Sequence, residues 1–455
     1  MLRLHDTATG QVKPLAQRDP GAVSMYVCGP TVYGLPHLGH GRASLVYDIL
    51  RRYLEWSGVS VRHVSNITDI DDKIINRARD ESRSAAEVAH QYDGEWYRAM
   101  DALGVLRPTV DPHATAYVEP MVDMIAALVD KGIAYETPDG VYLSVGDVDG
   151  YGLLAGQPLD SLRAGERVEV VEGKRSPFDF VLWKKAKPGE PSWPSPWGQG
   201  RPGWHTECVV MSLDLLGDGF DLHTGGMDLR FPHHENERAQ AVALGREFAR
   251  HWMHHAFVVD AGGEKMSKSL GNVSNLAELV ERYDPRSYRL LVLQSHYRSP
   301  MTVNAGTLDR AVTTLAGLDG LLRRAADAGL ARGATAAEPA HRAAFVAAMD
   351  DDLDTPQALA LVFEWVKEAN RLLDAGDPDG AGPVLAAVVD ALGAVGLDLG
   401  GAAAVVDDAS SDLVARRDAA RAARDWPEAD RLRAGLEASG WVVEDTPAGT
   451  RVHRR

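Results

Sequence analysis

Short apolar runs and one amphipathic stretch alternate over the first 70 residues of the chain. The run at 23–28 ends at a Gly-Pro pair, which predicts a buried strand followed by a turn. Apolar residues at helical spacing between 40 and 57 predict a helix that Gly58 closes, and apolar residues at 59–67 predict a second strand. Two strands joined by a crossover helix form a parallel pair. We therefore expect an open α/β sheet that binds its ligands at the carboxyl ends of the strands.

The pattern changes twice farther along the chain. From about 136 to 183 the sequence is rich in Val and Gly with strand-like alternation, which predicts an insertion that splits the sheet domain, and a second α/β half follows at roughly 200–260. From about 311 onward Ala, Leu and Arg dominate at helical spacing, with Gly-rich breaks between the helices. This part is predicted to be a helical bundle followed by a separate C-terminal piece.

Composition narrows the class of protein. A chain of 455 residues with 45% hydrophobic residues is too long for one compact core, so three or four domains are expected. No run reaches the roughly 18 uninterrupted apolar residues that a membrane span needs, which predicts a cytoplasmic protein without a membrane partner. The net charge of -17 argues against indiscriminate nucleic-acid binding, whereas nine arginines against eight acidic residues at 410–455 allow a local basic patch.

Two short motifs suggest phosphate chemistry. The first, His37-Leu-Gly-His40, lies between the predicted strand and helix, so both imidazoles face a helix N-terminus, where backbone N–H groups and the helix dipole favour anions. Gly39 lets a nucleotide approach the backbone closely. The second, Lys265-Met-Ser-Lys268-Ser, follows a Gly-Gly turn, and its lysines can neutralise charge on a triphosphate. Taken alone, the first motif fits two surface histidines better, and the second also fits a solvated basic loop. The strand-turn-helix context of the first motif, and its pairing with the second, favour a split ATP site.

The paired motifs resemble the two signature sequences of class I aminoacyl-tRNA synthetases. Further stretches narrow the resemblance to the cysteinyl-tRNA synthetase family, and it runs through nearly the whole chain. The stretches are 25–33 (MYVCGPTVY), 66–75 (NITDIDDKII), 178–184 (FDFVLWK), 202–208 (PGWHTEC) and 231–237 (FPHHENE). Leu38 and Gly34 depart from the residues that the family usually has there, Ile and Asp, and neither is a proposed catalytic group.

The resemblance implies ATP-dependent ligation of L-cysteine to tRNA-Cys through a cysteinyl-adenylate, with Mg²⁺ accompanying ATP and a monomer expected. It assigns catalysis to His37, His40, Lys265 and Lys268. It assigns ATP binding to Gly39 and Asp228 together with His37, His40 and Lys268. It assigns the amino-acid pocket to Gly29, Thr31, Thr68, Trp204 and His223. From the residues alone, Thr68 and Trp204 would be assigned to core packing, and a turn-forming role is the alternative for Asp228.

A metal site is a separate prediction. Only two cysteines occur, which suggests either unrelated core thiols or one shared metal. Cys28 ends the first strand, Cys208 begins the second half, and His233 and Glu237 are four apart on a predicted helix, hence on one face. Two thiolates, an imidazole and a carboxylate suit zinc better than magnesium or calcium. From spacing alone, three more histidines are equally available as ligands: His205, His223 and His234.

The resemblance assigns one Zn²⁺ to Cys28, Cys208, His233 and Glu237. A plain pocket separates isosteres by only about 10², so it would discriminate poorly between cysteine and serine. A thiol that ionises on zinc gains a soft bond of roughly 2.3 Å that a serine hydroxyl does not match at neutral pH. Zinc is therefore expected to select the amino acid, and no hydrolytic editing site is required.

The predicted fold is a Rossmann-like parallel-sheet domain split by an insertion, with a helical bundle and a small anticodon-binding domain after it. The segments are the first catalytic half (1–120), the connective insertion (121–195), the second catalytic half (196–255), the lysine-signature loop and stem-contact region (256–310), the helical bundle (311–405) and the C-terminal anticodon-binding domain (406–455). Two other functions are considered: a ligase that passes activated cysteine to an amino sugar, and a non-catalytic tRNA- or nucleotide-binding module.

Overall fold

The computed structural model describes most of the chain. The described residues are 1–156, 173–260, 275–330, 335–400, 408–446 and 449–454. Lys265 and Lys268, both predicted to be catalytic, lie outside them. In the described ranges, no helix combines the length and the apolar character that crossing a membrane requires.

A parallel sheet lies at the centre of the described structure, in the strand order β10-β9-β3-β4. Its strands are β3 (Ala22–Val27), β4 (Ser60–Ser65), β9 (Leu222–Gly226) and β10 (His251–His255). Nearly all of β3 is buried, as expected for a parallel strand with both faces covered. Helix α1 (Leu38–Trp56) is the crossover between β3 and β4, which confirms the predicted α/β class. The chain adds β4 on one side of β3 and later adds β9 and β10 on the other, so ligands are expected outside the carboxyl ends of β3 and β9.

Helix α1 also packs against α7 (Leu276–Arg282) and α8 (Pro285–Leu293), two helices that follow the sheet in the chain. The buried guanidinium of Arg289, in α8, pairs with the buried carboxylate of Asp48 at 2.5 Å. Arg289 also donates to the backbone oxygen of Val395 at 3.3 Å, just after α12 (Pro378–Ala394). A Cβ on Gly41 would lie 2.7 Å from a methyl of Leu276, so glycine is what lets α7 approach α1.

The chain leaves the sheet between β4 and β9. It forms α2 (Asp72–Asp80), α3 (Ala85–Ala102), α4 (Val118–Asp130) and an antiparallel sheet of β5 (Ala134–Thr137), β6 (Gly140–Leu143), β7 (Phe180–Lys185) and β8 (Gly200–Pro202). The last of these strands lies beyond 195, where the insertion was predicted to end, and the boundary itself stays a prediction. Helix α5 (Trp204–Leu216) then leads to β9, and α6 (Glu235–Leu244) leads to β10.

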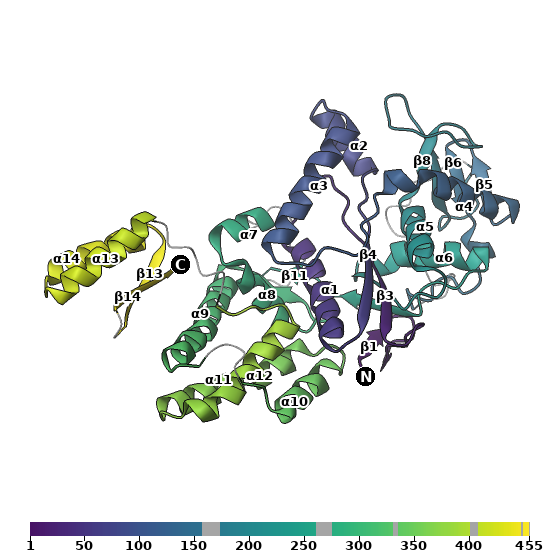
Figure 1. Cartoon of the computed structure of the whole chain (residues 1–455). Coiled ribbons are helices and arrows are strands. Elements are labelled where there is room, and N and C mark those ends of the chain that lie inside the picture. Colours follow the sequence, from purple (N-terminus) through teal and green to yellow (C-terminus); the bar gives the residue numbers. More distant parts are fainter. Residues whose placement is uncertain (157–172, 261–274, 331–334, 401–407, 447–448, 455) are drawn as a thin grey trace.

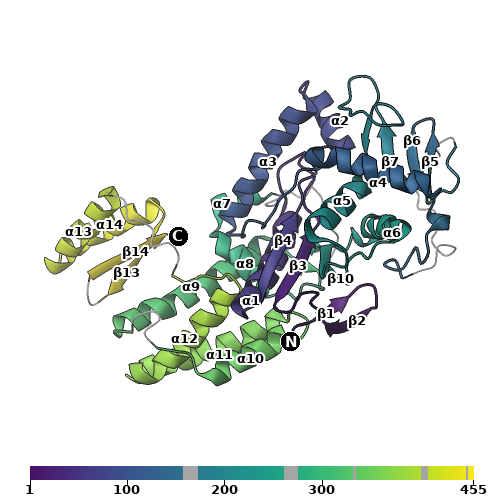
Figure 2. The same cartoon turned by 45° about the vertical axis from the view of Figure 1, so that its right-hand side comes forward.

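The remaining elements surround this core (Figure 1). They are β1 (Arg3–Asp6), β2 (Gln11–Pro14), β11 (Val258–Val259), β12 (Met301–Thr302), the bundle helices α9 (Ala305–Asp327), α10 (Pro339–Met349), α11 (Thr355–Asp374) and α12 (Pro378–Ala394), and the C-terminal α13 (Asp408–Ala422), α14 (Trp426–Ala438), β13 (Trp441–Thr446) and β14 (Gly449–Arg454). Figures 1 and 2 both show the insertion and the bundle on opposite sides of the sheet, with the C-terminal piece beyond the bundle.

Candidate functional site

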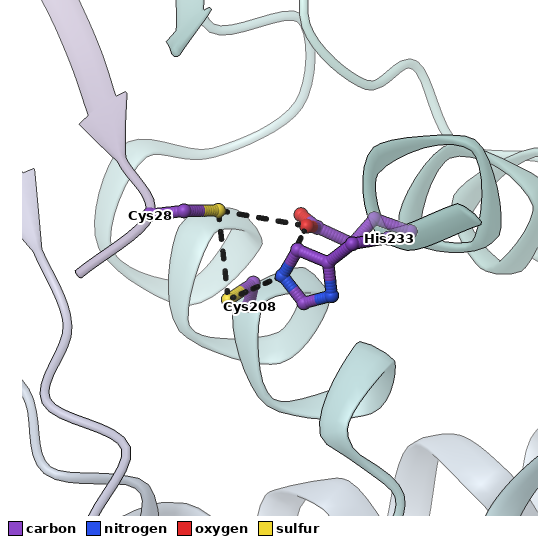
Figure 3. A group of neighbouring side chains, drawn as sticks. Cys28, Cys208 and His233 are labelled. Atoms are coloured by element: carbon purple, nitrogen blue, oxygen red, sulfur yellow. Dashed lines mark hydrogen bonds and ion pairs between the residues drawn. The ribbon is translucent and has the colours of Figure 1, made fainter. Parts of the chain in front are cut away.

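Two cysteines, a histidine and a glutamate meet at the carboxyl edge of the sheet (Figure 3). Cys28 directly follows β3, and Cys208 lies one turn inside α5. His233 belongs to a helical turn that precedes α6, and Glu237 lies in the first turn of α6. Cys28 is partly buried, and the other three side chains are almost completely buried. Residues 209 positions apart in sequence therefore form one compact cluster.

The spacing of these atoms tests whether zinc fits. The two sulfurs lie 3.9 Å apart, Cys208 Sγ lies 3.7 Å from His233 Nε2, and Cys28 Sγ lies 3.6 Å from Glu237 Oε1. His233 Nε2 and Glu237 Oε1 lie 3.0 Å apart. Tetrahedral zinc with ordinary bond lengths separates two sulfur ligands by about 3.8 Å, sulfur and nitrogen or oxygen by about 3.6 Å, and nitrogen and oxygen by about 3.4 Å. These four separations are close to those that zinc ligands show, and all four donor atoms lie within 4.8 Å of one another.

A second group of possible ligands shares Cys28 and Glu237 but replaces the other two with His223 and His234. In this group His223 Nε2 is 2.7 Å from Glu237 Oε2, the oxygen that faces away from the first group. His234 Nε2 lies 3.3 Å from Cys28 Sγ. The first group uses both thiols, and its members then receive support from the second, as metal ligands commonly do from outer neighbours. The donor set of the first group therefore suits zinc better than that of the second.

The remaining histidines extend this support. His205 Nδ1 lies 2.8 Å from His233 Nδ1, so it contacts the ring nitrogen that faces away from the cluster. His234 Nδ1 contacts His254 Nε2 at 2.8 Å, and His254 Nδ1 contacts the Thr7 hydroxyl at 2.7 Å. Burial lowers the pKa of His254 to about 3 and that of His205 to about 3. These rings are therefore neutral at pH 7, which lets each one both donate and accept a hydrogen bond.

The cluster itself is strongly polarised. Burial opposes the charged form of Glu237, but the neighbouring His223 and His233 outweigh it and lower the pKa of Glu237 to about 2. Contact with Cys28 lowers the pKa of Cys208 to about 6, whereas burial raises the pKa of Cys28 well above its usual value. Burial also disfavours the charged form of His233, yet the Glu237 carboxylate and Cys208 raise its pKa to about 10. A cation bound here would therefore displace protons from Cys28 and His233.

The residues predicted to line the amino-acid pocket lie beside the cluster. Gly29 follows Cys28, and a Cβ at this position would lie 1.6 Å from the backbone oxygen of Asn66, so only glycine fits. Thr31 and Thr68 pair as a short parallel β-bridge. The indole of Trp204 stacks on the His233 ring at 4.0 Å, and the residue is 37% exposed. His223, the fifth predicted pocket residue, bonds Glu237 as described above.

His37 and His40 form a different kind of pair at the start of α1. His37 Nδ1 accepts the backbone N–H of His40 at 3.3 Å, and His40 Nδ1 accepts that of His37 at 3.2 Å. The rings stack with their centroids 3.6 Å apart. Because each neutral ring accepts through Nδ1, its proton is on Nε2, which makes Nε2 a donor. A Cβ on Gly39 would meet the His37 ring at 3.0 Å, so glycine keeps space for this arrangement.

Other predicted ATP residues lie along the same edge. Asp228 is an exposed residue two positions after β9, in the turn that the Leu229 N–H closes onto the Gly226 oxygen at 2.9 Å. The segment that carries Lys265 and Lys268 lies outside the described residues. Its C-terminal flank is held at the histidine pair, because Asn275 forms a β-bridge with His37.

Sequence reasoning missed some residues of the site. Asn66 and Glu207 lie within the stretches that resemble the cysteinyl-tRNA synthetases. Their position beside Thr68 and Cys208 in these stretches was the signal that could have identified them. Asn66 Oδ1 accepts the Gly29 N–H at 2.9 Å, and Glu207 accepts the Thr68 hydroxyl at 2.8 Å. Thr7 gives no such signal, because only the fold brings the N-terminal hairpin to His254.

Comparisons with known proteins agree with this geometry. A family model described as the tRNA synthetases class I (C) catalytic domain matches residues 14–313, and one described as the DALR domain matches 344–400. The chain is 46% identical over 466 residues to the cysteine–tRNA ligase of Thioalkalivibrio sulfidiphilus, covering 99% of both chains. It is 44% identical over 465 residues to that of Thermotoga maritima, again covering 99% of both.

Solved structures support the fold alone. The chain is similar to a Mycobacterium tuberculosis methionyl-tRNA synthetase in complex with methionyl-adenylate, with a TM-score of 0.61 and 15% identity over 82% of this chain and 89% of that one. It is also similar to a LeuRS from Agrobacterium radiobacter, with a TM-score of 0.63 and 12% identity over 84% of each chain.

Proposed function

We propose that this chain, which belongs to the cysteine–tRNA ligase family of class I tRNA synthetases, uses ATP to join L-cysteine to tRNA-Cys through a cysteinyl-adenylate. The observation that carries the choice of amino acid is the buried cluster of Cys28, Cys208, His233 and Glu237, with donor atoms at zinc-like spacing. A cluster with two thiol ligands suits a soft metal, and a soft metal suits a substrate that carries a thiol.

We assign one Zn²⁺ to these four residues, where it would supply a soft acceptor for the substrate thiol that serine's oxygen does not match. The chain's own residues hold the rest of the amino acid. Gly29, Thr31 and Thr68 lie beside Cys28 and would orient the ammonium and carboxylate. Trp204 covers His233 and would exclude water from the side chain of cysteine.

In the first step, a carboxylate oxygen of cysteine attacks the α-phosphorus of ATP, the new O–P bond forms, and pyrophosphate leaves. No general base is needed, because the nucleophile is already an anion. His37 and His40 would donate through Nε2 to the phosphate oxygens from the N-terminus of α1, where the helix dipole adds to the effect. Lys265 and Lys268 would neutralise charge on the leaving pyrophosphate, to which Mg²⁺ is bound. Gly39 and Asp228 would position the nucleotide.

In the second step, a terminal ribose hydroxyl of the tRNA attacks the activated carbonyl, the ester bond forms, and AMP leaves. The C-terminal piece at 406–455 would read the anticodon, since arginine suits phosphate and exposed bases. The proposal places this reaction in the cytoplasm and in a monomer.

Charging of purified tRNA-Cys tests the proposal. The protein, loaded with zinc, is incubated with ATP, Mg²⁺ and labelled cysteine, and acid-precipitable label on the tRNA is measured. The proposal expects label on tRNA-Cys, little on tRNA-Ser, and little when labelled serine replaces cysteine. Cysteine-dependent ATP–pyrophosphate exchange without charging of tRNA-Cys would instead favour transfer to a small acceptor such as an amino sugar. The absence of both activities would favour a binding module.

A further inference from the structure

A chain of hydrogen bonds runs beside the metal cluster and ends at Glu207, an acid to which neither the motifs nor the metal site assigns a role. The backbone N–H of Gly29 donates to Asn66 Oδ1 at 2.9 Å. Asn66 Nδ2 donates to Thr68 Oγ1 at 3.2 Å, and the Thr68 hydroxyl donates to Glu207 Oε2 at 2.8 Å. Asn66, Thr68 and Glu207 are each 1% exposed, so water does not substitute for the contacts among these three side chains, whereas the Gly29 end of the chain is partly buried.

The chain joins three separate parts of the fold. Gly29 follows β3, Asn66 and Thr68 follow β4, and Glu207 lies in α5 directly before Cys208. Backbone bonds reinforce the first connection, because the Thr68 N–H donates to the Pro30 oxygen at 2.9 Å. The side-chain links to Glu207 add α5, the helix that carries Cys208 and begins at Trp204. The hydrogen bonds therefore join the turns proposed to hold the amino acid to the helix proposed to hold the metal.

The direction of the bonds depends on what stands at position 207. A threonine hydroxyl has one proton, so while it donates to Glu207 it can only accept from Asn66. The Asn66 amide must then present its nitrogen to Thr68 and its oxygen to Gly29. Without an acceptor at 207, the hydroxyl proton turns toward Asn66 and favours the flipped amide, which places the Asn66 nitrogen against the Gly29 N–H. Two donors then face each other in a buried place, which is costly.

We propose that Glu207 is a positioning residue that fixes the Gly29 and Thr68 turns in the conformation that binds the amino acid. It does so as a hydrogen-bond acceptor, through Thr68 and Asn66. This inference rests on the proposed activation of cysteine, but the backbone order that it predicts does not depend on any activity.

Two variants distinguish the loss of the hydrogen-bond acceptor at position 207 from a change in side-chain volume. Glu207→Met has nearly the same volume and no acceptor, whereas Glu207→Gln keeps an acceptor oxygen. We expect Glu207→Met to raise the KM for cysteine by about tenfold in ATP–pyrophosphate exchange, the value of one lost buried hydrogen bond. The KM for ATP and the zinc content should stay at the parent values. Glu207→Gln should remain within about threefold of the parent in the KM for cysteine.

Amide hydrogen exchange provides the readout that is independent of activity. In zinc-loaded protein without substrates, the peptide that contains Gly29 should exchange about tenfold faster in Glu207→Met than in the parent and Glu207→Gln. A peptide from α9, far from the site, serves as the internal control. If the parent shows no cysteine-dependent ATP–pyrophosphate exchange, the proposed function fails. The comparison of amide hydrogen exchange then still decides the role of Glu207.

The inference is overturned if Glu207→Met keeps the parent KM for cysteine and parent amide exchange at Gly29, or if Glu207→Gln shows the same losses as Glu207→Met. An equal loss of zinc and of ATP binding would also overturn it, because that indicates a merely structural role. Should Glu207→Met not fold, Glu207→Leu removes the same acceptor with another apolar side chain. Glu207→Gln is again its comparison, and equal Gly29 exchange and equal KM for cysteine in these two variants overturn the inference.

Discussion

Two groups of histidines lie at the carboxyl edge of the same sheet, yet they differ in burial and in the side chains around them. His37 and His40 stand at the exposed start of α1, with each ring capping the other's backbone N–H. His223, His233 and His234 are buried around two thiols and a carboxylate. In the proposed function, the pair at the start of α1 donates to a phosphate that binds and leaves, whereas the buried group holds one ion. The same side chain therefore serves phosphate contact or metal binding according to its burial and its partners.

Removing a ligand from the buried group should have the largest effect. Cys208→Ser replaces a soft donor with a hydroxyl that stays protonated, so we expect loss of bound zinc and a fall of about a thousandfold or more in kcat/KM for cysteine. Elemental analysis and ATP–pyrophosphate exchange measure the two quantities. Ser212→Ala, on the same helix, removes a hydroxyl that donates to the backbone oxygen of Val209 and is the matched control. Full zinc content and parent activity in Cys208→Ser would contradict the assignment.

Changing the histidine pair at the start of α1 should lower kcat and leave the zinc content unchanged. Losing one donor that stabilises transition-state charge costs about a hundredfold in kcat, so His40→Ala should show that loss. Its zinc content and its KM for cysteine should match the parent. His90→Ala, at an exposed histidine of α3, is the control. Zinc loss in His40→Ala would show that the two groups are not independent.

Replacing His205, which contacts a zinc-site histidine from outside the cluster, should weaken zinc binding by an intermediate amount. His205 contacts the ring nitrogen of His233 that faces away from the cluster. Its replacement by Leu should weaken zinc binding by about 10- to 100-fold, as the loss of an outer hydrogen bond to a metal ligand typically does. Competition with a chelator measures this affinity. An unchanged affinity would mean that His233 is held by its packing alone, for example by the stacked Trp204.

A buried histidine outside both groups should show the smallest effect. Both ring nitrogens of His63 are buried without a hydrogen-bond partner in the described structure. Burial, with a smaller contribution from Arg51, lowers the pKa of His63 from 6.5 to about 3. The unfolded chain then binds more protons between these values, so His63 costs stability as the pH falls below 6.5.

The expected cost is about 1 kcal/mol on going from pH 7.5 to 5.5, or about 2 °C in unfolding temperature. His63→Leu should remove this part of the acid sensitivity and leave stability at pH 7.5 equal or higher, because no hydrogen bond is lost. Thermal unfolding at the two pH values measures the difference. An identical pH dependence in the parent and in His63→Leu would show that His63 is protonated in the folded protein or is solvated.

The sequence predicts the main strands and helices better than it predicts the individual side-chain contacts of the site. Apolar spacing predicts β3, α1 and β4, and therefore that Cys28 lies at the ligand-binding edge of the sheet. It does not decide between His233 and its neighbour His234, because that choice depends on the turn before α6, which directs one ring toward Cys208 and the other toward Cys28. The contact of Glu207 with Thr68 joins residues 139 positions apart and requires the folded structure.

The central claim is that the buried group recognises the substrate through its thiol. Replacing zinc with Co²⁺ makes this visible, because a sulfur ligand on the metal adds a charge-transfer absorption. Titration of the Co²⁺-loaded protein with cysteine should increase this band, and the same concentrations of serine should leave it unchanged. A band that responds to neither amino acid, in protein that still performs cysteine-dependent ATP–pyrophosphate exchange, would contradict the claim.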